Sequence, residues 1–324
     1  MKRLRMRIEP HAGDPGRWGH SLLNLAELLV PCLDAVGARS VVEVGAYAGD
    51  LTGLLLEWAA RVDARVVAID PAPQKELVAL AEARDDLELI RQTSHDALKR
   101  IELPDAIVID GDHNYYTVSE ELRLIGERAQ EADLPLLLFH DVGWPHARRD
   151  SYYTPELIPE EHRQPMVAGG GVFPGLPGTR PGALPYKWTA AREGGPRNGV
   201  LTAIEDYVAE QDGLKLVVVP AFFGFGALWH VDAPWAEAVA GLLEPWDRNP
   251  VLARMEENRV FHLASTHVWM MEASIAREQN ARKDEVIAKL LNSKSFALAQ
   301  QISRLRRRGE PAFSTDALRR ALRD

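Results

Sequence analysis

The sequence predicts an α/β fold in which five parallel strands and a final antiparallel hairpin form one sheet. Short apolar runs alternate with helical stretches from residue 20 to residue 211. Such alternation is typical of a parallel sheet with right-handed crossover connections. The last two strands, 214–219 and 225–230, are separated by only five residues. Because this connection is too short for a crossover helix, we expect the pair to be antiparallel.

The expected elements follow one another in regular order along the chain. Strands are expected over 41–44, 65–70, 87–90, 106–109 and 134–139, and helices over 21–36, 51–60, 75–84, 117–130 and 199–211. Runs of β-branched and other apolar residues, such as 41–44, are typical of strands that are buried on both faces. Residues 93–96 are expected to form a loop beyond the third strand.

Composition excludes several classes of protein. The 324 residues carry a net charge of −9, which argues against a general nucleic-acid binder. The single cysteine, Cys32, excludes internal disulfides and suits a reducing cytosol. The basic start, residues 1–5, is not followed by the apolar run of a signal peptide, and no run is long enough to span a bilayer. We therefore expect a cytoplasmic protein without a membrane partner.

The first strand leads into a glycine turn that could hold a nucleotide-like ligand. Gly45 ends the strand and Gly49 precedes the next helix. This geometry brings backbone N–H groups close to a ligand. Asp70 ends the second strand about twenty residues after Gly49, where it could accept hydrogen bonds from a ribose diol. Alternatively, Asp70 is only a turn residue before Pro71.

The spacing G-x-x-x-G, with Glu43 two residues before it, resembles motif I of the class I S-adenosylmethionine-dependent methyltransferases. Over residues 20–232 the expected strands also resemble the Rossmann-like seven-stranded sheet of these enzymes. The resemblance implies S-adenosylmethionine as the cofactor. The implied candidate contacts are Glu43, Gly45, Ala46, Tyr47, Gly49, Asp70, Ser94 and Asp110.

Acidic and histidine side chains follow the fourth and fifth strands. Asp110, Asp112 and His113 follow one strand, and His140 and Asp141 follow the next. Ligands bind beyond these strand ends in open α/β sheets. Carboxylates brought together there would repel each other, and a hard divalent cation such as Mg²⁺ relieves the repulsion. The alternative is that Asp110 and Asp112 cap a turn and His140 is packed.

The pattern I-D-G-D-H-x-Y with a later H-D resembles the metal-dependent small-molecule O-methyltransferases, the group that includes macrolide-sugar O-methyltransferases and cephalosporin hydroxylase-like proteins. The resemblance implies that Asp110 and Asp141 are metal ligands and that His113 is the catalytic general base. His140 is a third candidate ligand, where the best-studied relatives have an acid. Imidazole is a poorer ligand for Mg²⁺ than carboxylate, so His140 favours Mn²⁺ or a transition metal.

The resemblance therefore implies methylation of a hydroxyl group on a small molecule such as a sugar, a polyketide or a phenol. Two alternatives remain. One is a non-catalytic protein that keeps the fold for binding or assembly. The other is an NAD-dependent oxidoreductase, for which the chain lacks both G-x-G-x-x-G and a Tyr-x-x-x-Lys pair.

We expect a methyltransferase domain over residues 1–233, interrupted at 142–198 by an insertion rich in glycine and proline. Long irregular connections are usually functional lids or disordered inserts. The aromatic and arginine content favours a lid that contacts substrate. The candidate contacts are Arg148, Arg149, Tyr152 and Tyr153, although the two arginines could instead form surface ion pairs.

Residues 234–324 are expected to form a helical appendage. Helices are expected over 235–243 and 293–308, with one long helix or two over 261–291. The appendage could pack on the sheet domain, form a homo-oligomer or dock a partner. Its heptad pattern is broken, which argues against a regular coiled coil.

Overall fold

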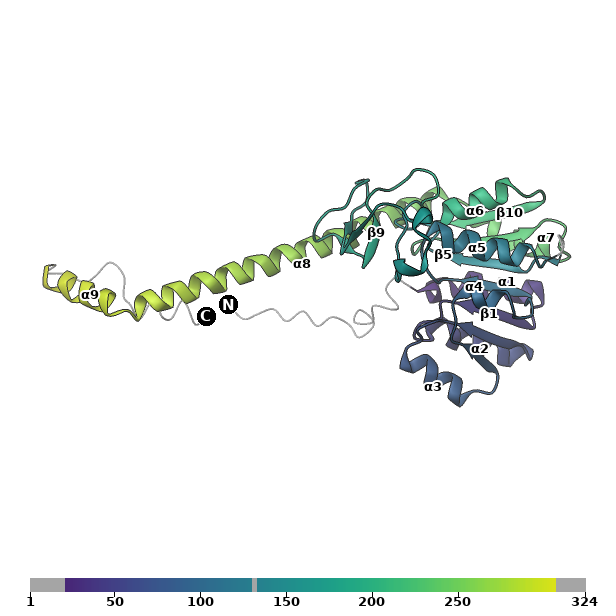
Figure 1. Ribbon diagram of the computed structural model, residues 1–324, viewed down its shortest axis with the longest axis horizontal. Helices are drawn as coiled ribbons and strands as arrows, with labels where there is room; N and C mark the ends of the chain where they lie inside the picture. Colours follow the sequence, from purple (N-terminus) through teal and green to yellow (C-terminus); the bar gives the residue numbers. More distant parts are fainter. Residues whose placement is uncertain (1–20, 130–132, 307–324) are drawn as a thin grey trace. The chain divides into compact units, whose positions relative to one another are not determined.

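The computed structural model describes residues 21–129 and 133–306, and its central feature is a seven-stranded sheet (Figure 1). The strands are β1 (Ser40–Val44), β2 (Arg65–Ile69), β3 (Leu87–Ile90), β4 (Ala106–Ile109), β5 (Leu136–His140), β10 (Leu214–Val219) and β11 (Phe225–His230). Their order is β10-β11-β5-β4-β1-β2-β3. β11 runs in the direction opposite to the other six strands. The predicted Rossmann-like sheet of five parallel strands and a hairpin is confirmed.

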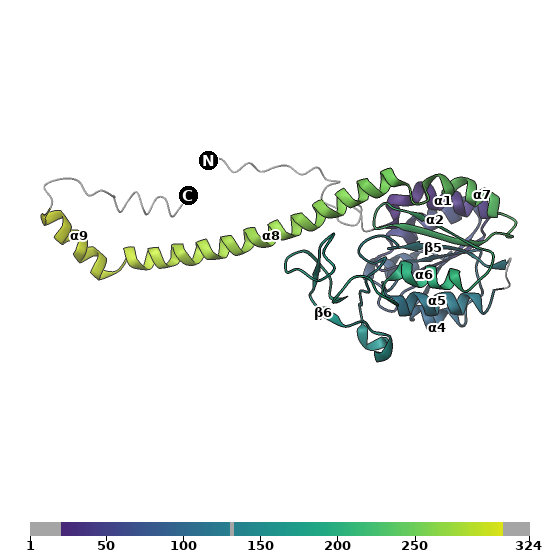
Figure 2. The same cartoon turned by 90° about the horizontal axis from the view of Figure 1, so that it is seen from above.

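Helices cover both faces of the sheet. They are α1 (Ala26–Val36), α2 (Asp50–Val62), α3 (Lys75–Ala83), α4 (Ser94–Leu98), α5 (Tyr115–Gly126), α6 (Val200–Ala209) and α7 (Ala236–Leu243). Figure 2 shows α1, α2 and α7 on one side of the sheet and α4, α5 and α6 on the other. Alternate residues of β1 enter the two resulting cores, Val41 on one face and Val42 on the other. Burial on both faces explains why this strand is a continuous apolar run.

The structure contains one short helix that the sequence does not indicate, and another helix that begins earlier than expected. Residues 93–96, expected to be a loop, form the start of α4, because Thr93 accepts a hydrogen bond from the backbone N–H of Asp96. A five-residue helix is too short to show apolar periodicity. The helix α5 begins at Tyr115, where Asn114 is the N-cap, and it ends at Gly126. Gln130, its expected end, lies outside the described residues.

The insertion at 142–198 contains two small antiparallel sheets. One pairs β6 (Met166–Ala168) with β9 (Trp188–Ala190), and the other pairs β7 (Gly171–Val172) with β8 (Leu184–Pro185). Asp150 anchors the insertion, since its Oδ1 accepts the backbone N–H groups of Tyr115 and Gly199 at 2.8 and 2.6 Å. That the insertion acts as a lid stays a prediction.

The C-terminal residues continue as η7 (Glu244–Trp246), α8 (Pro250–Leu291) and α9 (Lys294–Arg306). The expected helical stretch at 261–291 is thus part of one helix that begins at Pro250 (Figure 1). The chain divides into two compact units, Met1–Ala264 and Ser265–Asp324. A domain boundary after residue 233 stays a prediction. In the first unit α7 packs against α1.

The described helices and strands do not test several predictions about the chain ends and about partners. The basic start at residues 1–5, together with Arg307 and Arg308, lies outside the described residues. Within the described ranges, no helix combines the length and apolar character that crossing a membrane requires. The C-terminal helices expose Trp269 and Met270. A homo-oligomer formed through these helices stays a prediction.

The buried side chain of Glu121 on α5 should make stability depend on pH. Burial, the main cause, raises the pKa of Glu121 to about 8, and the charge of Asp112 acts in the same direction. The folded protein then holds this proton at pH values where the unfolded chain has lost it. Stability should therefore fall as the pH rises from the ordinary pKa of glutamate to about 8.

Glu121→Gln removes this titration, so the gain in urea midpoint over wild type should be larger at pH 8 than at pH 5. Glu120→Gln is the matched control, since Glu120 pairs with Arg123 on the same helix and its pKa is lowered. A difference between Glu121→Gln and wild type that stays constant with pH would contradict the assignment.

Candidate active site

A cavity of about 500 Å³ lies at the carboxyl ends of β1, β4 and β5. This is the edge where ligands bind in open α/β sheets. The turn after β1 contributes Gly45, Ala46 and Tyr47 to its wall, together with Glu43 from the strand. The ends of β4 and β5 contribute Asp110, His113 and Asp141, and the insertion contributes Tyr153 and Tyr186. The turn, the two strand ends and the insertion are far apart in the sequence and meet at one cavity.

The two glycines of the turn have different structural roles. Gly45 has φ +87°, and a methyl group on its Cα would overlap the backbone carbonyl of Asp110. Only glycine fits where the ends of β1 and β4 approach so closely. Gly49 has φ +89° and is the N-cap of α2. It faces Leu77 of α3 and does not line the cavity, so its contribution is to the shape of the turn.

The predicted cofactor acids occupy different positions. Glu43 is buried at the cavity wall, where it accepts a 2.6 Å hydrogen bond from Thr52, and burial raises its pKa to about 8. Asp70 accepts the backbone N–H groups of Tyr47 and Ala72 at 2.8 and 2.7 Å. It ties the glycine turn to the end of β2 and does not line the cavity. Ser94, at the start of α4, is also not among the lining residues.

The structure brings the predicted metal ligands and the predicted base together. Because β4 and β5 pair in parallel, Asp110 lies beside His140. Nδ1 of His140 is 3.1 Å from Oδ1 of Asp110 and 3.5 Å from Oδ2 of Asp141. Nε2 of His113 is 3.0 Å from Oδ2 of Asp141 and 3.7 Å from Oδ1 of Asp110. Two acids and two histidines thus form one cluster at the sheet edge.

Charge balance sets the protonation of this cluster. Burial disfavours the charged form of His140, but the charges of Asp110 and Asp141 outweigh it and raise its pKa to about 9. Burial also lowers the pKa of His113, but the charge of Asp141 outweighs this effect and raises the pKa above its ordinary value. Burial would raise the pKa values of the two carboxyl groups, but the histidines hold both below the ordinary value. In the protein alone, the histidines therefore supply the positive charge that the carboxylates need.

Hydrogen bonding fixes the orientation of His140. Its Nε2 lies 2.9 Å from the carbonyl oxygen of Phe222, which can only accept, so Nε2 carries the hydrogen. In the protonated ring Nδ1 carries a hydrogen too and donates it to Asp110. Asp112 is separate from the cluster, because its carboxylate accepts the backbone N–H of Tyr153 and the side-chain amide of Asn114. Asp112 therefore positions the insertion.

Of the four candidate contacts in the insertion, one reaches the cavity. Tyr153 lines it, with its ring 5.6 Å from that of His113. Arg148 forms an ion pair with Glu205 at 2.6 Å. Arg149 is buried and donates to the carbonyl groups of Ala190 and Pro177 at 2.8 and 2.7 Å. Tyr152 is also buried, and its hydroxyl donates to Asp150.

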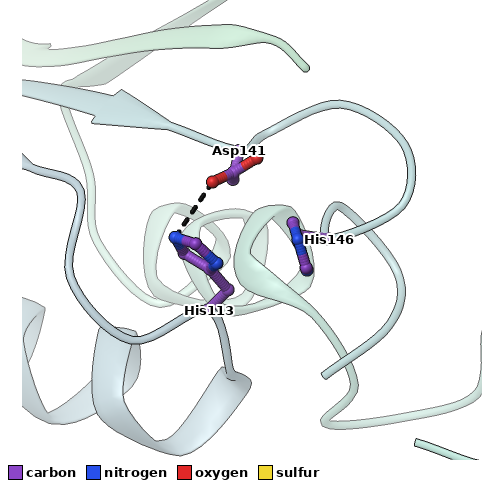
Figure 3. A group of neighbouring side chains, drawn as sticks. All are labelled: His113, Asp141 and His146. Carbon is purple, nitrogen blue, oxygen red and sulfur yellow. Dashed lines mark ion pairs between the residues drawn. The ribbon is translucent and has the colours of Figure 1, made fainter. Parts of the chain in front are cut away.

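The sequence analysis did not identify His146 and Tyr186 as site residues. His146 is buried, lines the cavity and has its ring 4.5 Å from that of His113. Figure 3 shows it beside His113 and Asp141. Burial lowers the pKa of His146 to about 3, so the ring is neutral. Both residues lie in the insertion, where no periodic pattern indicates which side chains point inward. The closeness of His146 to His140 and Asp141 in the sequence was the one signal that could have indicated its role.

The close approach at Gly45 predicts a large effect of one added methyl group. Gly45→Ala should lower the free energy of unfolding by about 2–3 kcal/mol, because the new Cβ meets backbone atoms at a left-handed φ. Urea denaturation measures this change. Gly53→Ala in α2 is the matched control, since a Cβ there meets no atom within 4 Å. It should stabilise the protein by about 0.5–1 kcal/mol. Equal midpoints for the two variants would contradict this reading of the turn.

The chain is similar to solved structures of methyltransferases. A crystal structure of a methyltransferase from Podospora anserina with S-adenosylhomocysteine bound is 17% identical, and the match covers 68% of this chain and 83% of that one, with a TM-score of 0.42. An O-methyltransferase from Bacillus cereus, also in complex with S-adenosylhomocysteine, is 15% identical and matches over 64% and 80%, with a TM-score of 0.38. Likenesses at this level concern the fold alone. No curated protein matches the chain.

A family model described as a methyltransferase domain matches residues 42–142. This segment runs from β1 to the residues that follow β5, so it includes the glycine turn, Asp110, His113 and Asp141. Residues 42–142 therefore match a methyltransferase domain, and the chain resembles the class I S-adenosylmethionine-dependent methyltransferases.

Proposed function

We propose that the protein transfers the methyl group of S-adenosylmethionine to a hydroxyl oxygen of a small molecule, and that it requires a divalent cation to do so. The observation that carries the proposal is the cluster of Asp110, Asp141 and His113 in one cavity with the glycine turn. A neutral hydroxyl is a poor nucleophile, and this cluster has the groups that could bind a cation and remove a proton.

The donor atoms support a divalent cation between the strand ends. Asp110, His140 and Asp141 each offer one ligand atom, and these atoms lie within 4.8 Å of one another. The N–H of His140 is held by a carbonyl, which leaves Nδ1 available to a cation, as is usual for ligating histidines. Two carboxylates suit Mg²⁺ or Mn²⁺, and the imidazole favours Mn²⁺ or a transition metal. Such a cation would lower the pKa of a hydroxyl bound to it.

His113 is the proposed general base. Its Nε2 points at Asp141, close to Asp110, and its ring borders the cavity. In the protein alone the carboxylates keep His113 protonated, and a protonated ring cannot accept a proton. His113 becomes a base only when the charge of these carboxylates is neutralised from another source. The base and the cation are therefore expected to act together.

The remaining walls favour a small acceptor. Tyr153 and Tyr186 bring aromatic surface from the insertion to the same cavity that the glycine turn lines. Aromatic walls with a few convergent polar groups are typical of small-molecule sites. Alignment of the acceptor oxygen with the methyl group would contribute much of the rate. Sugars, polyketides and phenols all meet these requirements.

Turnover should depend on a divalent cation. Excess chelator should abolish release of S-adenosylhomocysteine from a panel of hydroxylated metabolites, and added Mg²⁺ or Mn²⁺ should restore it. Asp110→Asn and His140→Ala should raise the cation concentration needed for half-maximal rate. Asp206→Asn, a carboxylate change outside the cavity, is the control and should leave this concentration unchanged. Full activity in excess chelator would remove the cation from the mechanism.

Loss of the base should slow the reaction without weakening cofactor binding. With saturating cofactor and cation, His113→Ala should lower kcat by about 10²-fold or more and leave the Kd of S-adenosylmethionine nearly unchanged. His95→Ala is the control, because His95 contacts the carbonyl of Thr117 away from the cavity. Normal turnover by His113→Ala would show that no histidine base is needed.

A further inference from the structure

His146 has a buried polar atom that its place beside the cluster does not by itself explain. The side chain is 4% exposed, and its Nδ1 is buried without a hydrogen-bond partner among the described residues. Burying an unpaired polar atom costs free energy, so such an atom in a native site needs an explanation. The ring also lines the cavity and meets Tyr186 edge-on, with ring centroids 4.8 Å apart. A packed, neutral histidine at a cavity wall is a suitable ligand for a metal ion.

His113, Asp141 and His146 offer three ligand atoms within 4.8 Å of one another (Figure 3). The distance from Nε2 of His113 to Oδ2 of Asp141 is already 3.0 Å. Ligand atoms on a tetrahedral Zn²⁺ ion lie about 3.3 Å apart, since the bonds are about 2.0–2.1 Å long. The ligand atom of His146, which lies within 4.8 Å of the other two, would have to approach them to complete three bonds. All three residues line the cavity, so a fourth ligand could reach the ion from there.

This trio differs in chemistry from the group proposed to hold Mg²⁺ or Mn²⁺. That group has two carboxylates and one imidazole, whereas the trio has two imidazoles and one carboxylate. Imidazole ligands favour zinc and other transition metals, while oxygen ligands favour Mg²⁺ and Mn²⁺. The two groups share Asp141. They therefore select different cations but compete for one carboxylate.

We propose that His113, Asp141 and His146 form a second, nitrogen-rich metal site of the zinc class, and that its occupation inhibits methyl transfer. The inhibitory part rests on the function proposed above. When the Nε2 lone pair of His113 binds a metal, it is no longer free to accept the hydroxyl proton. Asp141 is also drawn away from the oxygen-rich group. Bound zinc thus blocks the general base and weakens binding of the activating cation.

Equilibrium dialysis of the full-length protein against Zn²⁺ alone, with the bound metal measured by mass spectrometry, tests the site directly. His146→Phe keeps an aromatic ring against Tyr186 and removes the ligand, so it should weaken zinc binding by about tenfold or more. His146→Gln is a second variant in case the first fails to fold. Asp110→Asn is the matched control, because it disables the oxygen-rich group and leaves the trio intact. Its zinc affinity should change by much less.

Two further readouts separate this site from the proposed function. Co²⁺ in place of zinc should give the visible spectrum of a four-coordinate ion in wild type and lose it in the His146 variants. In Mg²⁺-activated turnover, the zinc concentration for half inhibition should rise about tenfold or more in those variants, each compared with its own zinc-free rate. Equal zinc affinity in wild type and in folded His146 variants would overturn the site, whatever the protein methylates. Absence of turnover would count against the proposed function and leave the binding result standing.

Discussion

The ends of β4 and β5 bring two carboxylates into one buried cluster, and the rest of the site follows from the need to balance their charge. Parallel pairing of the two strands places Asp110 beside His140 and Asp141. Buried carboxylates cannot stay ionised without compensating charge. In the protein alone the compensation comes from His113 and His140, whose pKa values are raised as a result. In the proposed mechanism a divalent cation takes over this compensation, and His113 is then released to act as a base.

The side of the cavity that the glycine turn forms is coupled to this cluster through the backbone. Gly45 lies so close to the carbonyl of Asp110 that no side chain fits between them. The glycine turn and the carboxylate cluster are therefore fixed relative to each other by the register of β1 against β4. Asp70 adds a second constraint, because it holds the turn through the N–H of Tyr47. Such rigidity is what alignment of a methyl donor with an acceptor oxygen requires.

The sequence was most informative where one pattern repeats and least informative in the insertion. Buried strands are continuous apolar runs, so the sheet and its hairpin could be predicted, and with them the meeting of Asp110, His113, His140 and Asp141. Glycine spacing located the turn, but spacing alone could not show that Gly49 and Asp70 shape it from outside the cavity or that Ser94 begins a helix. The position of His146 depends on the path of residues 142–198, which is set by single contacts such as those of Asp150. Contacts of this kind leave no periodic trace in the sequence.

We propose above all that the cavity beside Gly45 holds a sulfonium methyl donor. Calorimetric titration of the full-length protein with S-adenosylmethionine, S-adenosylhomocysteine and NAD, with and without Mg²⁺, tests this claim most directly. We expect one S-adenosylmethionine or one S-adenosylhomocysteine to bind per chain, and NAD to give no measurable heat. Binding of NAD without binding of either adenosyl compound would contradict it.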